Sequence, residues 1–259
     1  LTVLYDDKGY PSYMRVIPKF RYEDLGFGTE LGTGVATAFL KDGVEKSEIF
    51  VGQYPAMTQD GRAVSLPGKD PRASIDWDDS VAVCENKGPG WHMMTVHEWA
   101  AIALWCKANG FQPRGNTDYG RAHDATHETA VRQDDGTPGD GTGTARTMTG
   151  GGPASWRHNG EADGIADLVG NVWEWQWGAK IVDGRLFAAP DNDPGLDEAN
   201  WTDTGVDMAD GSRTWTTDTV TGTQLTDRLL FTYPGIDLQG NLYVDATDER
   251  FPRRGGSWS

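Results

Sequence analysis

Two histidines have the spacing that most directly suggests metal chemistry. His123 and His127 lie four residues apart, with Asp124 and Glu128 beside them, and a pair at this spacing can bind zinc from one face of a helix. Glycine and aspartate flank the segment, no third ligand stands near it, and Asp124 occupies the place of the glutamate in a His-Glu-x-x-His motif. We therefore interpret the segment as a solvated polar loop.

Thiol chemistry is the second candidate, and it depends on two residues. Cys84 and Cys106 are the only cysteines among the 259 residues, and each lies at an apolar position of a predicted helix. A reactive thiolate needs an exposed and electropositive setting, and two cysteines are too few for a disulfide scaffold. We favour two buried thiols over a disulfide or a redox pair.

The glycine-rich runs at residues 139–144 and 150–153 suggest phosphate binding by composition. They lack the lysine and hydroxyl pair of a P-loop, and the carboxylates around them oppose an anion. The formal net charge of -16 would repel a nucleic-acid backbone, and no basic cluster is longer than Arg253-Arg254. No apolar run approaches the roughly 20 residues of a transmembrane helix. We expect no nucleic-acid partner and no membrane insertion.

The elements that must position any site are predicted to be short. The chain has 34 glycines and 11 tryptophans, and apolar residues make up 37% of it, which favours a loop-rich fold fixed by a few large side chains. Its length allows one domain, or one domain with a small appendage. We favour a single domain over residues 1–259. Residues 1–45 form a β-rich lead-in, and residues 46–259 form a core that we expect to continue past Ser259.

Two helices have clear boundary signals. The first begins at Asp76 as its cap and ends at Gly88. The second spans residues 96–108, because Thr95 and Glu98 form a Thr-x-x-Glu capping box at its start and Asn109-Gly110 follows its end.

Strands and loops are predicted for the rest of the chain. Residues 1–68 alternate short apolar stretches with turns, and Asp183-Gly184 predicts a hairpin over residues 181–187. Residues 115–165 predict a long surface loop region without a packed element. Residues 190–250 are polar and rich in turns, with Trp201 and Trp215 as anchors.

Four stretches occur in the order typical of one protein family. They are residues 74–84 around Trp77-Asp78-Asp79, residues 95–99 (Thr-Val-His-Glu-Trp), residues 167–175 (Asp-Leu-Val-Gly-Asn-Val-Trp-Glu-Trp) and residues 254–258 (Arg-Gly-Gly-Ser-Trp). In these stretches the chain resembles the formylglycine-generating enzyme family, over roughly residues 45–259. Each stretch alone is a weak signal, and their common order is specific. The resemblance implies an α+β fold, the C-type lectin fold of this enzyme type, with two short helices packed on small antiparallel sheets and much irregular structure.

The resemblance also implies a metal site. In that family the turn corresponding to residues 167–174 holds a calcium ion (Ca2+) through one side chain, two backbone carbonyls and a glutamate, which correspond here to Asp167, Gly170, Val172 and Glu174. This ligand set suits a hard cation, which prefers several oxygens at close range. The alternative is a purely structural turn in which Glu174 makes a hydrogen bond.

Catalysis is not implied by the residues present. The oxidising members of the family bind copper with a cysteine pair that begins two residues after the Gly-Gly-Ser-Trp strand, and Ser259 lies one residue short of that point. Neither Cys84 nor Cys106 matches those positions. We therefore predict no catalytic residues in this sequence. The alternative function is a formylglycine-generating or related oxidoreductase whose catalytic cysteines lie beyond Ser259.

A second group with this fold is more similar in detail. Residues 13–20, 65–68, 90–92 and 113–116 resemble the variable proteins of diversity-generating retroelements, which present a ligand-binding surface. This resemblance implies a display protein on a phage tail or bacterial surface, with a protein or glycan receptor as its partner and a homo-oligomer as one arrangement. Arg254, Trp258 and Ser259 would border the ligand-binding face.

A plain carbohydrate-binding lectin is the third hypothesis. It would stack sugar rings on exposed tryptophans. Because Trp173 and Trp175 belong to the motif predicted to form the core, the candidates are Trp156, Trp201 and Trp215.

Overall fold

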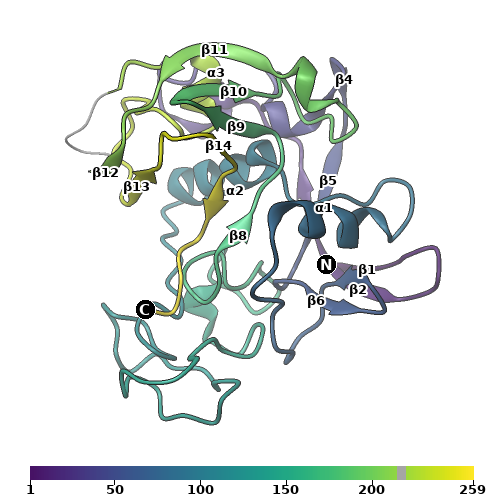
Figure 1. Cartoon of the computed structure of the whole chain (residues 1–259), viewed down its shortest axis with the longest axis vertical. Coiled ribbons are helices and arrows are strands. Elements are labelled where there is room, and N and C mark those ends of the chain that lie inside the picture. The colour runs from purple at the N-terminus through teal and green to yellow at the C-terminus, as the bar shows by residue number, and fades with distance from the viewer. Residues whose placement is uncertain (215–219) are drawn as a thin grey trace.

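A helix near the centre of the molecule, α2 (Val96–Ala108), organises the surrounding elements (Figure 1). The computed structural model describes residues 1–214 and 220–259. The predicted capping box is confirmed, since the Thr95 hydroxyl accepts from the Glu98 amide at 3.1 Å and the Glu98 carboxylate accepts from the Thr95 amide at 3.0 Å. Helix α1 (Trp77–Glu85) also begins as predicted, with the Asp76 side chain accepting from the Asp79 amide.

Small antiparallel sheets and short helices surround these two helices. The first sheet pairs β1 (Thr2–Tyr5), β2 (Pro11–Pro18) and β5 (Glu48–Gly52) in that order. A four-stranded sheet has the order β11 (Thr202–Asp207), β10 (Arg185–Ala188), β9 (Ala179–Val182) and β14 (Glu249–Arg250). The two-stranded pairs are β3 (Leu40–Lys41) with β4 (Val44–Glu45), β6 (Met57–Gln59) with β7 (Arg62–Val64), β12 (Gly211–Thr214) with β13 (Asn241–Val244), and β8 (Glu174–Trp175) with β15 (Arg253–Arg254). The fold is therefore mixed α+β with short helices and small antiparallel sheets.

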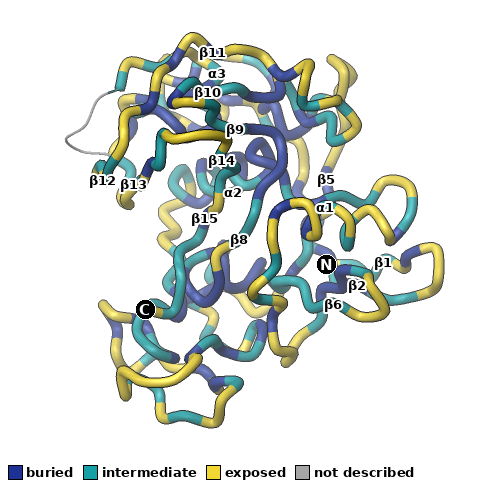
Figure 2. The backbone as a smooth tube through the Cα atoms, viewed as in Figure 1, coloured by how far each residue is buried: buried dark blue, intermediate teal, exposed yellow. Residues whose placement is uncertain are grey.

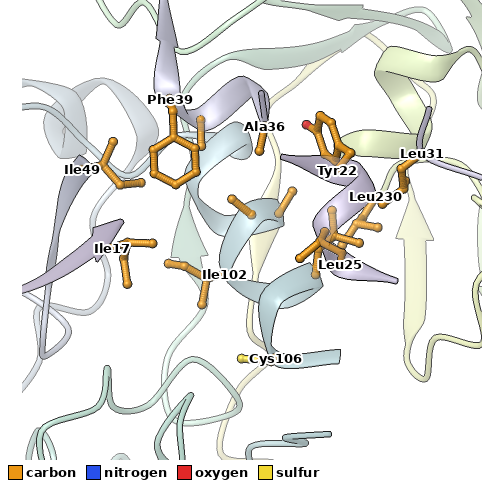
Figure 3. Close-up of a cluster of buried hydrophobic side chains, with 14 of the residues drawn as sticks. Ile17, Tyr22, Leu25, Leu31, Ala36, Phe39, Ile49, Ile102, Cys106 and Leu230 are labelled. Carbon is orange, nitrogen blue, oxygen red and sulfur yellow. The ribbon is translucent and has the colours of Figure 1, made fainter. Parts of the chain in front are cut away.

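The main hydrophobic core packs around α2. Its buried side chains come from segments far apart in the sequence, from Ile17 on β2 to Ile236 near the carboxyl end, and Ile102 and Cys106 of α2 lie among them (Figure 3). Tyr22, Leu25 and Phe39 belong to the same cluster. Residues of the predicted lead-in at 1–45 thus share a core with α2.

Several elements differ from the prediction. Residues 1–68 include two short 3-10 helices, η1 (Tyr22–Leu25) and η2 (Thr37–Phe39). Residues 190–250, predicted to be mostly turns, contain η4 (Glu198–Asn200), helix α3 (Gln224–Arg228) and strands of two sheets. The strands there are two to six residues long, too short for a hydrophobic period to be recognised.

The segment 115–165 forms much of the lower part of the molecule, where exposed and intermediate backbone predominates (Figure 2). Its one helical element is η3 (Ala154–Trp156), among the described residues. The loop is nevertheless anchored internally, because the Arg132 side chain is only 1% exposed and pairs with Asp134 at 2.7 Å and Asp140 at 2.6 Å. It also donates to the Thr142 carbonyl. The contacts of the buried Arg132 guanidinium, and not regular secondary structure, therefore hold this loop in place.

Candidate functional site

The turn before β8 has a backbone that only certain residues adopt. Gly170 and Asn171 both have positive φ, at 72° and 64°. A Cβ on Gly170 would lie 2.2 Å from the Asn116 carbonyl oxygen, so this position requires glycine. The buried Asn171 amide group pairs with the backbone of Thr147, accepting at 2.7 Å and donating at 3.1 Å. The turn is therefore held rigidly against the 115–150 segment.

This turn places two of the predicted metal ligands, Asp167 and Glu174, close enough for their charges to interact. Asp167 is buried, and its Oδ2 accepts from the Gly150 amide at 2.7 Å, while its Oδ1 has no partner among the described residues. Oε2 of Glu174 is likewise enclosed and without a partner in the described chain. Burial raises the pKa of Asp167 to about 6. Burial, together with the charge of Asp167, raises the pKa of Glu174 to about 8.

The acid pair fits a calcium ion in its donor chemistry. Each of the two carboxyl groups has an enclosed, unused oxygen, and the charge of Asp167 raises the pKa of Glu174, so a hard divalent cation would stabilise both groups in their ionised form. Within residues 1–214 and 220–259 no further His, Cys, Asp or Glu joins them in a cluster of three. The Gly170 and Val172 carbonyls of the same turn are the additional oxygens that the predicted ligand set names.

The carboxyl-terminal strand β15 runs beside this turn. It pairs with β8 so that Arg254 lies opposite Glu174 and Arg253 opposite Trp175. The Gly255 carbonyl accepts from the Gly170 amide at 2.7 Å. The closing strand and the acidic turn are therefore one hydrogen-bonded unit.

The three predicted ligand-contact residues have different environments. Arg254 is only 9% exposed, and its guanidinium donates to the Leu230 carbonyl at 3.1 Å and the Leu229 carbonyl at 2.8 Å. Burial lowers the pKa of Arg254 to about 10. Trp258 is half-buried and its carbonyl accepts from the Tyr119 amide at 2.7 Å, while Ser259 is exposed. Arg254 thus acts as an internal anchor, and the last residues lie at the surface near the lower loops (Figure 1).

A cavity of about 880 Å³, which we call the α2 groove, lies next to this anchor. Its walls come from α2, from the segments 110–117, 123–124, 168–169 and 238–241, and from Leu230 and Arg254. The side chains of Gln112 and Gln239 meet across it at 2.9 Å. Two N–H groups of its lining residues, Nε1 of Trp99 and Nε of Arg254, have no acceptor among the described residues. Both atoms are enclosed by the protein, so a ligand in the groove would instead meet the exposed polar side chains of its rim, such as Gln112 and Gln239.

No local sequence signal identifies the α2 groove. Its lining residues are separated by more than a hundred positions along the chain, and each lies in a loop or on a helix face whose role depends on the others. Of its lining residues, the sequence predicts a ligand-binding role only for Arg254, while Cys106, His123 and Asp124 were considered for other chemistry.

The thiols and histidines take the structural roles predicted for them. Both cysteines are free; Cys106 is buried as predicted, whereas Cys84 is partly exposed, and burial raises their pKa to about 12 and about 11 respectively. Neither therefore has the character of a thiolate ligand or nucleophile. His123 and His127 are exposed and lie outside any helix, so their spacing does not place them on a common helical face.

The predicted roles of the tryptophans are partly wrong. Trp173 is 51% exposed, although its motif was expected to lie in the core. Successive side chains in an extended segment point to opposite sides, so the inward Glu174 leaves Trp173 outward. Trp156 and Trp201, proposed as exposed stacking residues, are buried at 1% and 5% exposure. Trp215 lies outside the described residues.

Comparison of the chain with protein-family models and with curated proteins yields no match. No helix in the described part of the chain combines the length and apolarity needed to cross a membrane.

Proposed function

We propose that this chain is a ligand- or receptor-binding display protein on a frame of the C-type lectin type, similar to the variable proteins of diversity-generating retroelements. The partner is a protein or glycan receptor, and the place of action is a phage tail or a bacterial surface. The observation that carries the proposal is the location of the half-exposed carboxyl-terminal edge beside the rigid acidic turn and a large groove with exposed polar side chains at its rim.

The physical argument is a separation of frame and surface. Arg254 and Gly255 are bound to neighbouring backbone, whereas Ser259 is exposed. Side chains at the exposed end and on the exposed rim of the α2 groove, such as Gln112 and Gln239, can therefore change without loss of packing. Protein carbonyls and sugar hydroxyls can both accept hydrogen bonds from the Gln112 and Gln239 side-chain amides at the rim of the groove.

The test compares two tryptophan substitutions at exposed glutamines. Gln239→Trp fills the edge of the α2 groove, and Gln59→Trp on β6 is the matched control away from it. Labelled protein is incubated with intact bacterial cells and with a glycan panel. We expect retention of the wild type and the control, and at least about tenfold weaker retention of Gln239→Trp, equivalent to 1.4 kcal/mol.

Two results contradict this proposal. One is equal binding by both variants, or no binding by the wild type. The other is copper-dependent oxidation of a cysteine-containing peptide by the chain, which would support the alternative oxidoreductase function.

A further inference from the structure

A second cavity, of about 220 Å³, lies between β2, α1 and β8. Its lining includes Ser12, Met14, Tyr54, Lys87 and Trp91. The exposed Trp173 also contributes, so the cavity reaches the surface. It shares no lining residue with the α2 groove except Leu168.

Lys87 is the unusual residue of this cavity. It is only 3% exposed, and its Nζ lies 2.6 Å from the buried Ser12 hydroxyl and 3.6 Å from the centre of the Trp91 ring. By contrast, Lys180 pairs with Glu198 at 3.1 Å and with Glu249 at 2.9 Å. Among the described residues no carboxylate lies within ion-pair distance of Lys87. A buried ammonium in this position has a hydroxyl and an aromatic face as partners, but no counter-charge.

The surroundings of Lys87 favour the neutral amine. Burial lowers the pKa of Lys87 to about 8. The nearest charged groups, Asp6 and Arg62, pair with each other at 3.3 Å, and the thiol of Cys84 is protonated because burial raises its pKa to about 11. Arg72, His92 and Glu174 line the same cavity without forming an ion pair with Lys87 among the described residues. A neutral amine is a nucleophile, and desolvation in an apolar pocket is a known means of activating lysine.

From this geometry we propose that the cavity binds small aldehydes or ketones, which Lys87 captures reversibly as an imine. The amine lone pair forms a bond to the carbonyl carbon, and the carbonyl π electrons move to oxygen. The Ser12 hydroxyl passes the proton from nitrogen to that oxygen, giving a carbinolamine. The C–O bond then breaks, nitrogen loses its remaining proton, and one water leaves. No oxidant or reductant is required.

The ligand class follows from the size and lining of the cavity. Met14, Met93 and Met94 offer apolar surface, and the Ser12 and Ser65 hydroxyls offer hydrogen bonds at one side. Such a lining suits a small uncharged carbonyl compound. The inference is independent of the proposed display function, because it uses a different cavity.

The test traps the imine in the intact chain. Propanal and sodium cyanoborohydride are added at about pH 7.5, and peptide mass spectrometry compares the propyl adduct at Lys87 with adducts at the exposed Lys8 and Lys69. An amine of pKa about 8 has a neutral fraction more than about a hundredfold above that of an ordinary lysine at this pH. After allowance for its lower basicity, we expect Lys87 to react at least about tenfold faster.

The pH profile and one variant complete the test. The rate at Lys87 should level off above about pH 8, while the rates at exposed lysines continue to rise. Ser12→Ala should slow Lys87 several-fold without slowing Lys8, and Ser12→Thr should restore the rate. A Lys87 that stays unmodified, or that reacts no faster than Lys8 and Lys69, overturns the proposal in the wild-type chain without any variant. Parallel reactions with calcium and with a chelator keep the result independent of Glu174.

Discussion

The substitution Glu174→Gln tests the acid pair, because it replaces a buried carboxyl group by an amide of the same shape. Without metal, the pKa of Glu174 is raised to about 8, against about 4.3 in an unfolded chain. The folded state therefore binds the proton more tightly. The stability that this group contributes is fully present below about pH 4 and is lost as pH rises through 8.

The size of this loss sets the expected effect. The full difference in pKa corresponds to at most about 5 kcal/mol of unfolding free energy. The stability gained by the variant is smaller, because the wild-type site relaxes locally and the new amide has no hydrogen-bond partner. We expect metal-free Glu174→Gln to be about 2 kcal/mol more stable than the wild type near pH 8, or roughly 5 °C in melting temperature. Near pH 5 the two proteins should differ little.

Calcium should reverse this order. At a concentration about a hundredfold above its Kd, a ligand that binds only the folded state stabilises it by about 2.7 kcal/mol. The wild type should gain this stability, while Glu174→Gln, which lacks a charged ligand oxygen, should gain little. The variant is then more stable than the wild type in chelator and less stable in calcium.

Thermal melts followed by circular dichroism in chelator, calcium and magnesium measure these differences. Glu161→Gln removes an exposed carboxylate of the same chain and is the matched control for non-specific cation effects on an acidic protein. The reasoning is refuted if chelation leaves the wild-type melt unchanged, or if Glu174→Gln responds to calcium as strongly as the wild type.

Three further predictions concern the frame. Arg132→Met removes the buried contacts of the 134–142 loop, so we expect a loss of about 3 kcal/mol in urea titrations and faster proteolysis within that loop. Burial lowers the pKa of His97 to about 4, so the folded state favours the neutral imidazole. The stability that this group contributes is fully present above about pH 6.5 and is lost as pH falls through 4. His97→Gln should remove this pH dependence of the unfolding free energy, which amounts to at most about 3 kcal/mol. Denaturant titrations at several pH values measure it. Trp156→Ala should cost about 3–5 kcal/mol, whereas Trp173→Ala at the surface should change unfolding free energy by less than about 0.5 kcal/mol.

The helix starts and hairpins could be predicted from sequence because their causes are local. The Thr95 to Glu98 capping box spans four residues, and the Asp183-Gly184 turn has positive φ at both positions, which these residue types tolerate. The start of α3 is equally local, since the Thr223 hydroxyl accepts from the Thr226 amide. Its five residues, however, are too few for a hydrophobic period to be recognised.

Other features depend on contacts between distant segments and could not be predicted. Arg254 is buried because the Leu229 and Leu230 carbonyls, which follow α3, lie against its guanidinium. The motif that contains Arg254 does not encode those partners. The exposure of Trp173 similarly depends on which side of the segment leading into β8 faces the protein. A shift of one residue in strand pairing would turn every side chain to the opposite face.

If the proposed display function holds, the closing strand explains how a binding surface can vary beside a fixed site. Gly255 has φ 89°, and a Cβ there would lie 3.1 Å from the Leu168 carbonyl oxygen, while its own carbonyl holds the Gly170 amide. A side chain at Gly255 would therefore disturb the turn that carries the acid pair. Ser259, four residues further, is exposed. The residues that the frame requires therefore extend at least to the Trp258 carbonyl, which accepts from the Tyr119 amide, and the proposed display function predicts that ligand-selected side chains begin at the exposed end of this short segment.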